Sequence, residues 1–303
     1  AKGIEPYIET DCAALLVNLL VASGIAMGRG PYVQVGAKRH YAVLNAVTVG
    51  GTADNKSDAK TPIMEMTNQA WSASIEAGME VAYGELAPPM LPGGLSTGEG
   101  LLWQIRDERR EKRHNKKTGT VDEVVADEGV ADKRLLVVEA EFARVLAVMY
   151  RDGNTLSTVL RDLFDCPPEA KSCPKNNPVK ATAPHVGLIG QVTPEELERK
   201  MHDVELFNGF ANRFLWPMTH RVKSLPSPPD YTPMARTHAE WWVQAVYKAR
   251  ARGAIHRDHH AEQQWQIVYD QLRDGERPGL PPRQGFAREV CARAQVMVLR
   301  IAR

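Results

Sequence analysis

Three short apolar runs constrain the fold of this chain more than any other feature. They cover residues 41–49 (YAVLNAVTV), 134–139 (RLLVVE) and 185–190 (HVGLIG). Runs of this length, bounded by glycine or by charged residues, are typical of strands that are buried on both faces of a sheet. Segments with helical periodicity separate them. Because strands that alternate with helices form parallel sheets, the sequence favours an α/β fold with a mostly parallel sheet.

The segments between the runs carry recognisable helix signals. The strongest is at Thr193, which is followed by Pro194 in the first turn and by Glu196 three residues after the cap. A short strand is expected at residues 32–35, and a mobile loop at residues 112–132, which show no core pattern. Helices are expected over residues 11–27, 62–77, 101–113, 142–149 and 155–164.

A cluster of prolines between Pro226 and Pro233 separates two parts of different character. We expect an α/β domain over residues 1–225 and a helical appendage over residues 226–303. The chain stops inside an apolar pattern, as expected of a piece trimmed from a longer protein. Helices of the appendage are expected over residues 237–252, over residues 261–273 and from residue 286 onward.

Composition argues against several classes of protein. The chain has 38 basic and 37 acidic side chains in 303 residues, and this balance argues against a polybasic partner mode. The longest apolar stretch, residues 13–27, is interrupted by polar residues and is shorter than the roughly 20 residues that span a membrane. The four cysteines are scattered, which fits a reduced cytoplasm better than a secreted disulfide framework. A cytoplasmic location is therefore expected.

The segment after the first apolar run matches most of a phosphate-binding loop, G-x4-G-K-[ST]. In such a loop, backbone N–H groups surround a phosphate, the lysine contacts the outer phosphates and the hydroxyl binds Mg²⁺. Asn55 stands where the second glycine is expected, and asparagine tolerates left-handed backbone better than most residues. The alternative is a polar strand-to-helix loop with a chance lysine. The candidate nucleotide-binding residues are Gly50, Gly51, Thr52, Asn55, Lys56 and Ser57.

An ATPase also needs an acidic residue at the end of a neighbouring buried strand, to hold Mg²⁺ directly or through water. Glu139 ends the second apolar run, and Glu141 follows two residues later. Gln191, directly after the third run, is in the position of a polar sensor of the γ-phosphate. Glu99, in a glycine-rich turn, is another carboxylate able to orient the attacking water. The alternative is that these acids only cap the strand or helix beside them.

Several longer segments resemble one protein family: residues 95–101 (LSTGEGL), 132–143 (DKRLLVVEAEFA), 153–157 (GNTLS) with Leu160 and Arg161, 185–193 (HVGLIGQVT) and 208–216 (NGFANRFLW). The family is a group of domains of unknown function in plasmid, phage and integrative-element proteins, often fused to a primase-polymerase domain. It is regarded as a family of P-loop, RecA-like or helicase-like ATPases. The resemblance covers residues 10–225.

The resemblance implies a RecA-like core that binds ATP and Mg²⁺ and drives a helicase-like motor on single-stranded or forked DNA. It implies a homo-oligomer such as a hexameric ring, and a primase-polymerase domain in the same chain or in a partner. Mg²⁺ is then assigned to Ser57 and Glu139. Arg213 becomes a candidate for an arginine that contacts phosphate in the adjacent subunit. Its alternative is an ion pair with an acidic neighbour in its own chain.

Departures from the family pattern keep two other hypotheses open. The family's loop continues with a basic, glycine-containing run, whereas residues 55–59 read NKSDA. This difference favours a non-catalytic, helicase-like scaffold for DNA docking or oligomerisation. A third hypothesis, a Mg²⁺-dependent nuclease or nucleotidyl transferase, requires Glu99, Glu139 and Glu141 to converge.

Weaker signals concern nucleic acid and zinc. The basic run at residues 106–117 is able to contact a nucleic-acid backbone, but it contains three acids and a solvated helix face is the more common interpretation. Cys166 and Cys173 lack further ligands at zinc spacing, so they are poor evidence for a metal site.

Overall fold

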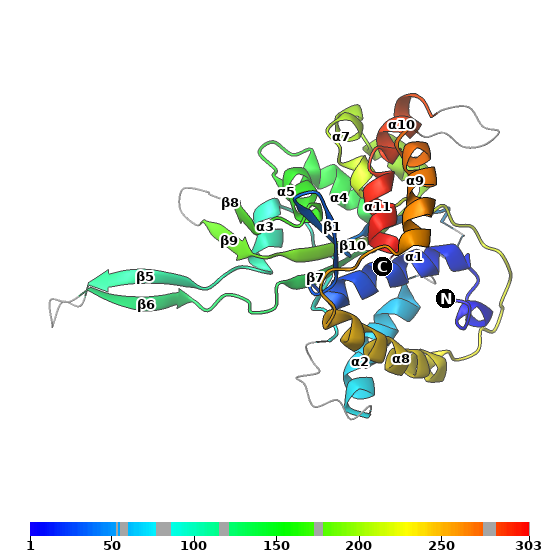
Figure 1. Ribbon diagram of the computed structural model, residues 1–303, viewed down its shortest axis with the longest axis horizontal. Helices are drawn as coiled ribbons and strands as arrows, with labels where there is room; N and C mark the ends of the chain where they lie inside the picture. Colours follow the sequence, from blue (N-terminus) through cyan, green and yellow to red (C-terminus); the bar gives the residue numbers. More distant parts are fainter. Residues whose placement is uncertain are drawn as a thin grey trace.

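A four-stranded parallel sheet forms the centre of the protein (Figure 1). Its strands lie in the order β3 (Asn45–Val49), β10 (His185–Val192), β7 (Arg134–Glu139) and β4 (Met90–Pro92), and every neighbouring pair is parallel. The expected mixed α/β fold with a parallel sheet is therefore confirmed. The computed structural model describes residues 1–52, 54, 60–76, 86–114, 121–172, 178–274 and 283–302.

An extended segment after the sheet lies along the outer edge of β3. The Val47 N–H donates to the Leu215 carbonyl at 2.9 Å, and the Leu215 N–H donates to the Asn45 carbonyl at 2.8 Å. The Thr219 N–H continues the ladder to the Val49 carbonyl at 2.8 Å. The bridges are parallel, so this segment extends the sheet by one line of chain beyond β3.

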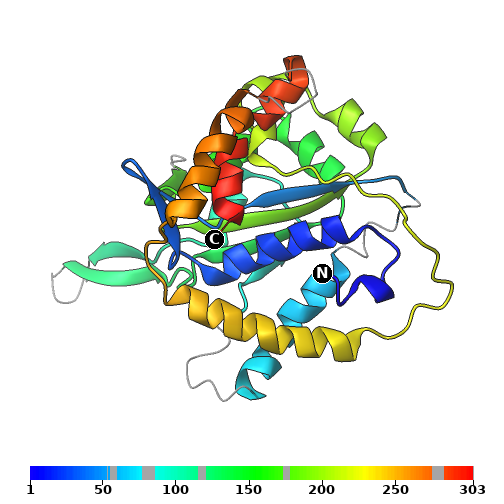
Figure 2. The ribbon, with the colours of Figure 1, turned by 45° about the vertical axis from the view of Figure 1, so that its right-hand side comes forward.

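Helices cover both faces of the sheet (Figure 2). On one face, α1 (Cys12–Met27) packs against β3, β7 and β10, and α2 (Thr61–Glu76) and α8 (Thr232–Arg250) pack beside it. On the other face, α4 (Phe142–Met149) and α5 (Leu156–Phe164) lie against β10. Because both faces are covered, the central strands are buried throughout, which explains their continuous apolar runs.

The elements described after residue 226 are the predicted helices, and these helices also pack against the α/β core. Trp242 of α8 shares an apolar cluster with Ala26 of α1 and Met66 of α2, and its indole N–H donates to Ser23 Oγ at 2.8 Å. Arg300 is 4% exposed and donates to the Val43 carbonyl at 2.7 Å. The predicted division between residues 225 and 226 stays a prediction.

Three expectations about secondary structure were wrong. The helix predicted over residues 101–113 stops at Trp103. Residues 112–114 and 121–127 of the predicted loop belong to a hairpin of β5 (Arg109–His114) and β6 (Val121–Asp127). Both strands are solvent-exposed on both faces, so they lack the apolar alternation by which strands are recognised. The run at residues 41–49 is not one strand, because Tyr41 ends β2 (Lys38–Tyr41) and β3 begins only at Asn45.

Other expected elements have nearly the predicted bounds, including the full capping box at Thr193. The elements not yet given are η1 (Glu5–Tyr7), β1 (Tyr32–Val35), α3 (Gly98–Trp103), β8 (Glu169–Ser172), β9 (Val179–Thr182), α6 (Pro194–Lys200), α7 (Asp203–Phe207), η4 (Ala211–Arg213), α9 (His259–Asp274), α10 (Gly285–Cys291) and α11 (Ala294–Ile301). No helix in the described part of the chain is both long enough and apolar enough to cross a membrane.

Candidate functional site

The ends of three motif-bearing strands meet at one edge of the sheet. The parallel register pairs Gln191 of β10 with Thr48 of β3 and pairs Gly190 with Glu139 of β7. The glycine-rich segment that starts at Gly50 therefore lies at the same edge as the acidic strand end. Ligands of open α/β sheets bind at this carboxyl edge. One expectation needs correction: the acidic strand is not adjacent to β3, because β10 lies between them.

Glu139 is a buried carboxylate that is held on two sides. Its side chain is 2% exposed. The Leu95 N–H donates to Oε1 at 2.7 Å, and Arg144 donates to Oε2 at 3.1 Å. A buried carboxylate is costly unless it is paired and hydrogen-bonded, and both conditions are met here. Glu139 is therefore a fixed negative charge at the carboxyl edge.

A cavity of about 260 Å³ opens beside Glu139, and Glu141, Arg144 and Lys60 also line it. Lys60 directly precedes α2, and its carbonyl accepts from the N–H groups of Ile63 and Met64, both at 3.1 Å. The cavity thus joins the start of α2 to the end of β7 and contains two acids and two cations. Sequence reasoning missed Lys60. The available signal was a second lysine-hydroxyl pair, Lys60 followed by Thr61, at the predicted start of the helix.

In the described part of the glycine-rich loop, the Asp54 side chain closes a turn by accepting a hydrogen bond from the backbone. The Gly50 N–H donates to the Val192 carbonyl at 3.2 Å, and the Asp54 carboxylate accepts from the Gly51 N–H. The Asp54 N–H in turn donates to the Gly51 carbonyl at 3.2 Å. Thr52 lies in this turn. The predicted phosphate and metal ligands Asn55, Lys56 and Ser57 lie outside the described residues.

Gln191 and Glu139 leave the sheet on opposite faces. Ile189, two residues before Gln191, packs in the cluster around α1, whereas Val137, two residues before Glu139, packs in the cluster around α4. Side chains alternate along a strand, so Gln191 faces α1 and Glu139 faces α4. The structure therefore places Gln191 and Glu139 at the same edge of the sheet but on opposite faces of it.

Glu99 is not among the residues that line the cavity beside Glu139. It lies in the first turn of α3, and its Oε1 accepts from Thr155 Oγ1 and from Ser172 Oγ, both at 3.0 Å. Burial acts to raise the pKa of Glu99, but hydrogen bonds from its own backbone, Thr155 and Ser172 outweigh burial and lower it. These contacts hold Glu99 as an ionised link between α3, α5 and β8.

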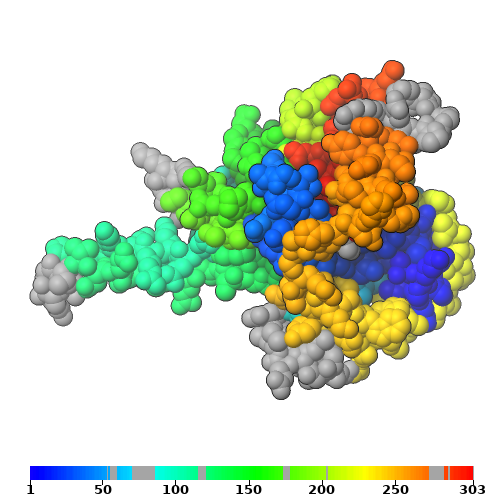
Figure 3. Space-filling view, in the orientation of Figure 1, coloured from blue at the N-terminus to red at the C-terminus, as the bar shows by residue number. Residues whose placement is uncertain are grey.

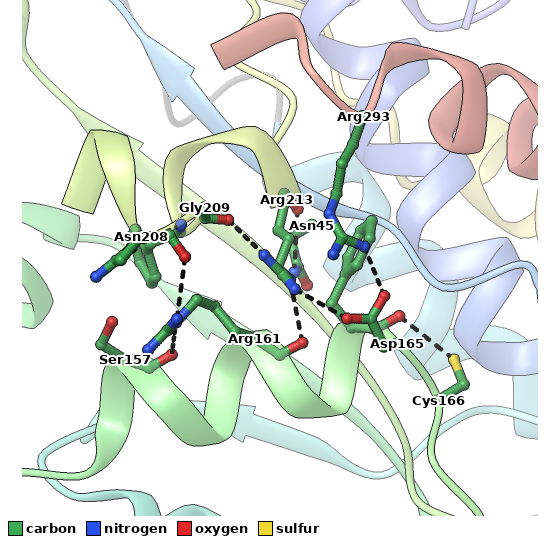
Figure 4. Close-up of polar contacts among 11 residues, drawn as sticks. Asn45, Ser157, Arg161, Asp165, Cys166, Asn208, Gly209, Arg213 and Arg293 are labelled. Atoms are coloured by element: carbon green, nitrogen blue, oxygen red, sulfur yellow. Dashed lines mark hydrogen bonds and ion pairs between the residues drawn. The ribbon is translucent and has the colours of Figure 1, made fainter. Parts of the chain in front are cut away.

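Arg213 is engaged within its own chain (Figure 4). Its side chain donates to the carbonyls of Gly209 at 2.6 Å and Arg161 at 3.2 Å, and it forms an ion pair with Asp165 at 2.9 Å. Arg293, just before α11, binds the other oxygen of Asp165 at 2.6 Å. This is the ion pair weighed as the alternative for Arg213, and the role in an adjacent subunit stays a prediction.

Two of the segments that carry the family resemblance contact each other in the same region (Figure 4). Arg161 donates to the Asn208 carbonyl at 3.0 Å. Ser157 and Asn208 both donate to the same oxygen of Glu205, at 2.7 and 3.1 Å. The polar residues of these segments thus form one network that joins α5 to the turn before Arg213, which gives them a structural role.

No group of three or more His, Cys, Asp or Glu side chains able to hold a metal ion occurs among the described residues. Glu99, Glu139 and Glu141 are all described, so the convergence that the nuclease hypothesis requires is not observed. Comparison of the chain with models of known protein families gives no match, and comparison with curated proteins gives none.

Proposed function

We propose that the chain is the RecA-like P-loop ATPase core of a helicase-like motor that acts on DNA during replication of a mobile genetic element. One observation carries the proposal: the glycine-rich segment after β3, Gln191 of β10 and Glu139 of β7 lie at the carboxyl edge of one parallel sheet. Gln191 lies on the strand between the loop and Glu139, the position proposed for a sensor of the outermost phosphate, and its side chain faces α1 rather than the Glu139 side of the sheet. The family resemblance supports the same assignment.

The cavity beside Glu139 fits the chemistry of a Mg²⁺–triphosphate group. Mg²⁺ at nucleotide sites is held by one or two carboxylates together with phosphates and water, so Glu139 and Glu141 suffice without a third acid. Mg²⁺, when bound, neutralises charge on the phosphate oxygens. Lys60 and Arg144 add positive charge, and the start of α2 favours anions. We assign Lys60 to the phosphates alongside Lys56 and Ser57.

One observation favours the second candidate, a helicase-like scaffold without catalysis. The Asp54 carboxylate accepts from the Gly51 N–H, a donor that a phosphate needs in a functional loop. Together with Asn55 in place of glycine, this closed turn is what we expect of a loop that no longer binds phosphate. In that case the protein serves as a docking or oligomerisation module.

The test is ATP turnover with and without single-stranded DNA, at concentrations that permit oligomers. We compare the wild type with Lys56→Ala and Lys60→Ala. Removal of one preorganised group that stabilises transition-state charge costs about 10²–10³-fold in turnover, and a loss of that size is expected for each variant. The matched control is Lys38→Ala, an exposed lysine of β2, which should keep wild-type turnover.

A second measurement separates binding from chemistry. Glu139→Gln is expected to bind Mg²⁺-ATP in calorimetry but to turn it over at least 10²-fold more slowly, because the carboxylate acts on the metal and the water. Wild-type protein that neither binds nor hydrolyses ATP would reject the motor and leave the scaffold. Asp54→Ala then becomes informative, because it removes the acceptor of the Gly51 N–H, and gain of nucleotide binding would show that the carboxylate closes the loop.

A further inference from the structure

The hairpin of β5 and β6 projects from the body of the protein as a long arm (Figures 1 and 3). The two strands pair with each other over Arg109–His114 and Val121–Asp127, and no third strand joins them in the part of the chain that the structure describes. An isolated two-stranded hairpin is marginally stable in water, and each outer edge offers backbone groups for another strand. The arm therefore has the form of an interaction element.

The base of the arm is fixed to the body, so its direction is set by the fold. Arg106, just before β5, forms an ion pair at 2.8 Å with Asp127 at the end of β6. Asp107 binds Lys133 at 2.8 Å and accepts from the N–H and hydroxyl of Thr182 in β9. The hydrogen bond from Arg106 holds the pKa of Asp127 below its ordinary value. An arm anchored in this way loses little freedom when it docks.

The two strands of the arm have opposite charge. β5 carries a formal charge of +3, from four cations and one acid with His114 neutral, whereas β6 carries −3 from three acids and has no cation. The formal charges of these two strands sum to zero, so the strands themselves give little attraction for a phosphate backbone. β6 also exposes two valines, Val121 at 63% and Val125 at 48%.

We propose that the arm docks onto a second copy of this chain, with β5 of one copy adding to the outer edge of β6 of the next. Opposite charges on neighbouring strands then alternate across the enlarged sheet, which favours pairing. Pairing of β5 with β5 places +3 against +3, and pairing of β6 with β6 places −3 against −3, so both symmetric contacts are disfavoured. The contact is head-to-tail, and such contacts build closed rings or open filaments. This inference does not depend on ATP binding.

The first test is sedimentation of the nucleotide-free protein at about 50 μM in 0.1 M and 1 M NaCl. The Debye length shrinks from about 10 Å to about 3 Å over this range, so we expect self-association to weaken at least tenfold. A neutralised variant combines Lys112→Gln, Arg113→Gln, Asp122→Asn and Glu123→Gln. It leaves the net charge of the arm unchanged, but it also removes two cross-strand charge pairs inside the hairpin, Lys112 with Glu123 and Arg113 with Asp122. We therefore expect it to be monomeric while amide hydrogen exchange shows that β5 and β6 remain paired.

Cross-linking tests the head-to-tail orientation. The four native cysteines are first replaced by serine. In this background, copies with Lys112→Cys carry one tag, copies with Glu123→Cys carry another, and a bis-maleimide is added to each and to their mixture. We expect cross-links between positions 112 and 123 in the mixture and no 112–112 or 123–123 products alone. A monomeric wild type, a neutralised variant that still assembles, or symmetric products only would overturn the proposal. Loss of single-stranded DNA binding in the neutralised variant, with assembly unchanged, would make nucleic acid the occupant instead.

Discussion

His185 shows how one buried side chain sets a pH dependence. It is fully buried in β10, and its Nε2 lies 2.9 Å from the Gly24 carbonyl. Burial lowers the pKa of the imidazole from 6.5 to about 3, and the positive charges of Arg29, Arg134 and Arg300 act in the same direction. The ring is therefore neutral at pH 7 and donates from Nε2 to the carbonyl.

The sign of the effect on stability follows from that lowered pKa. The unfolded chain binds a proton at His185 below pH 6.5, whereas the folded protein resists it down to about pH 3. The contribution of the neutral ring to the free energy of unfolding is complete above pH 6.5. As the pH decreases from 6.5 to about 3, this contribution is lost by up to about 1.4 kcal/mol per pH unit. Imidazole NMR titration checks this: His185 should stay neutral at pH 5, where an imidazole with the ordinary pKa of about 6.5 is protonated. Titration of His185 near pH 6.5 would contradict it.

The sequence predicts the place of a candidate site residue only where that residue ends or directly follows a recognisable strand. The position of Glu139 at the carboxyl edge could be predicted because a parallel sheet brings its carboxyl ends together, whereas the catalytic roles of Glu139 and Glu141 stay predictions. The environment of Glu99 could not be predicted, because its partners Thr155 and Ser172 are more than 50 positions away in sequence. Lys60 was missed because the G-x4-G-K-[ST] motif has a fixed spacing. Counted from Gly50, the motif ends at Ser57, three residues before Lys60.

At the scale of single elements, the capping box of α6 offers a clean measurement. The Glu196 N–H donates to Thr193 Oγ1 at 3.2 Å, and the Thr193 N–H donates to Glu196 Oε2 at 3.2 Å. Thr193→Ala removes the side-chain acceptor and should lower the free energy of unfolding by about 1 kcal/mol. Thr193→Ser keeps the hydroxyl and should cost much less. Urea denaturation checks both variants, and equal losses would show that the hydroxyl is not the cause.

Elements were predictable when their own residues carry the signal. The helix that starts after Thr193 was recognised from its cap, and β7 from its continuous apolar run. β5 was not, because all but one of its residues are exposed and the strand exists through pairing with β6. Between β2 and β3, the apolar composition continues while the backbone leaves one sheet for another. Composition reports burial there, not strand boundaries.

At the scale of the whole molecule, the open question is whether the C-terminal helices form a unit of their own. Trp242 and Trp241 of α8 provide a matched pair: Trp242 is 8% exposed, and Trp241 is 69% exposed. If α8 belongs to the core, Trp242→Ala should cost about 3–5 kcal/mol of unfolding free energy, as for other buried aromatic residues. Trp241→Ala should change it by no more than about 0.5 kcal/mol.

The number of unfolding transitions decides how the loss of unfolding free energy in Trp242→Ala is interpreted. Trp242 packs on α1 and α2, and Arg300 donates to the backbone between β2 and β3, so residues from both ends of the C-terminal region contact the α/β core. We therefore expect one transition, shifted to lower denaturant by Trp242→Ala and reported identically by fluorescence and circular dichroism. Two transitions, of which only one moves, would instead show that the helices after residue 226 unfold separately. A single shared transition makes α8 a structural support for α2, whose first turn borders the candidate site.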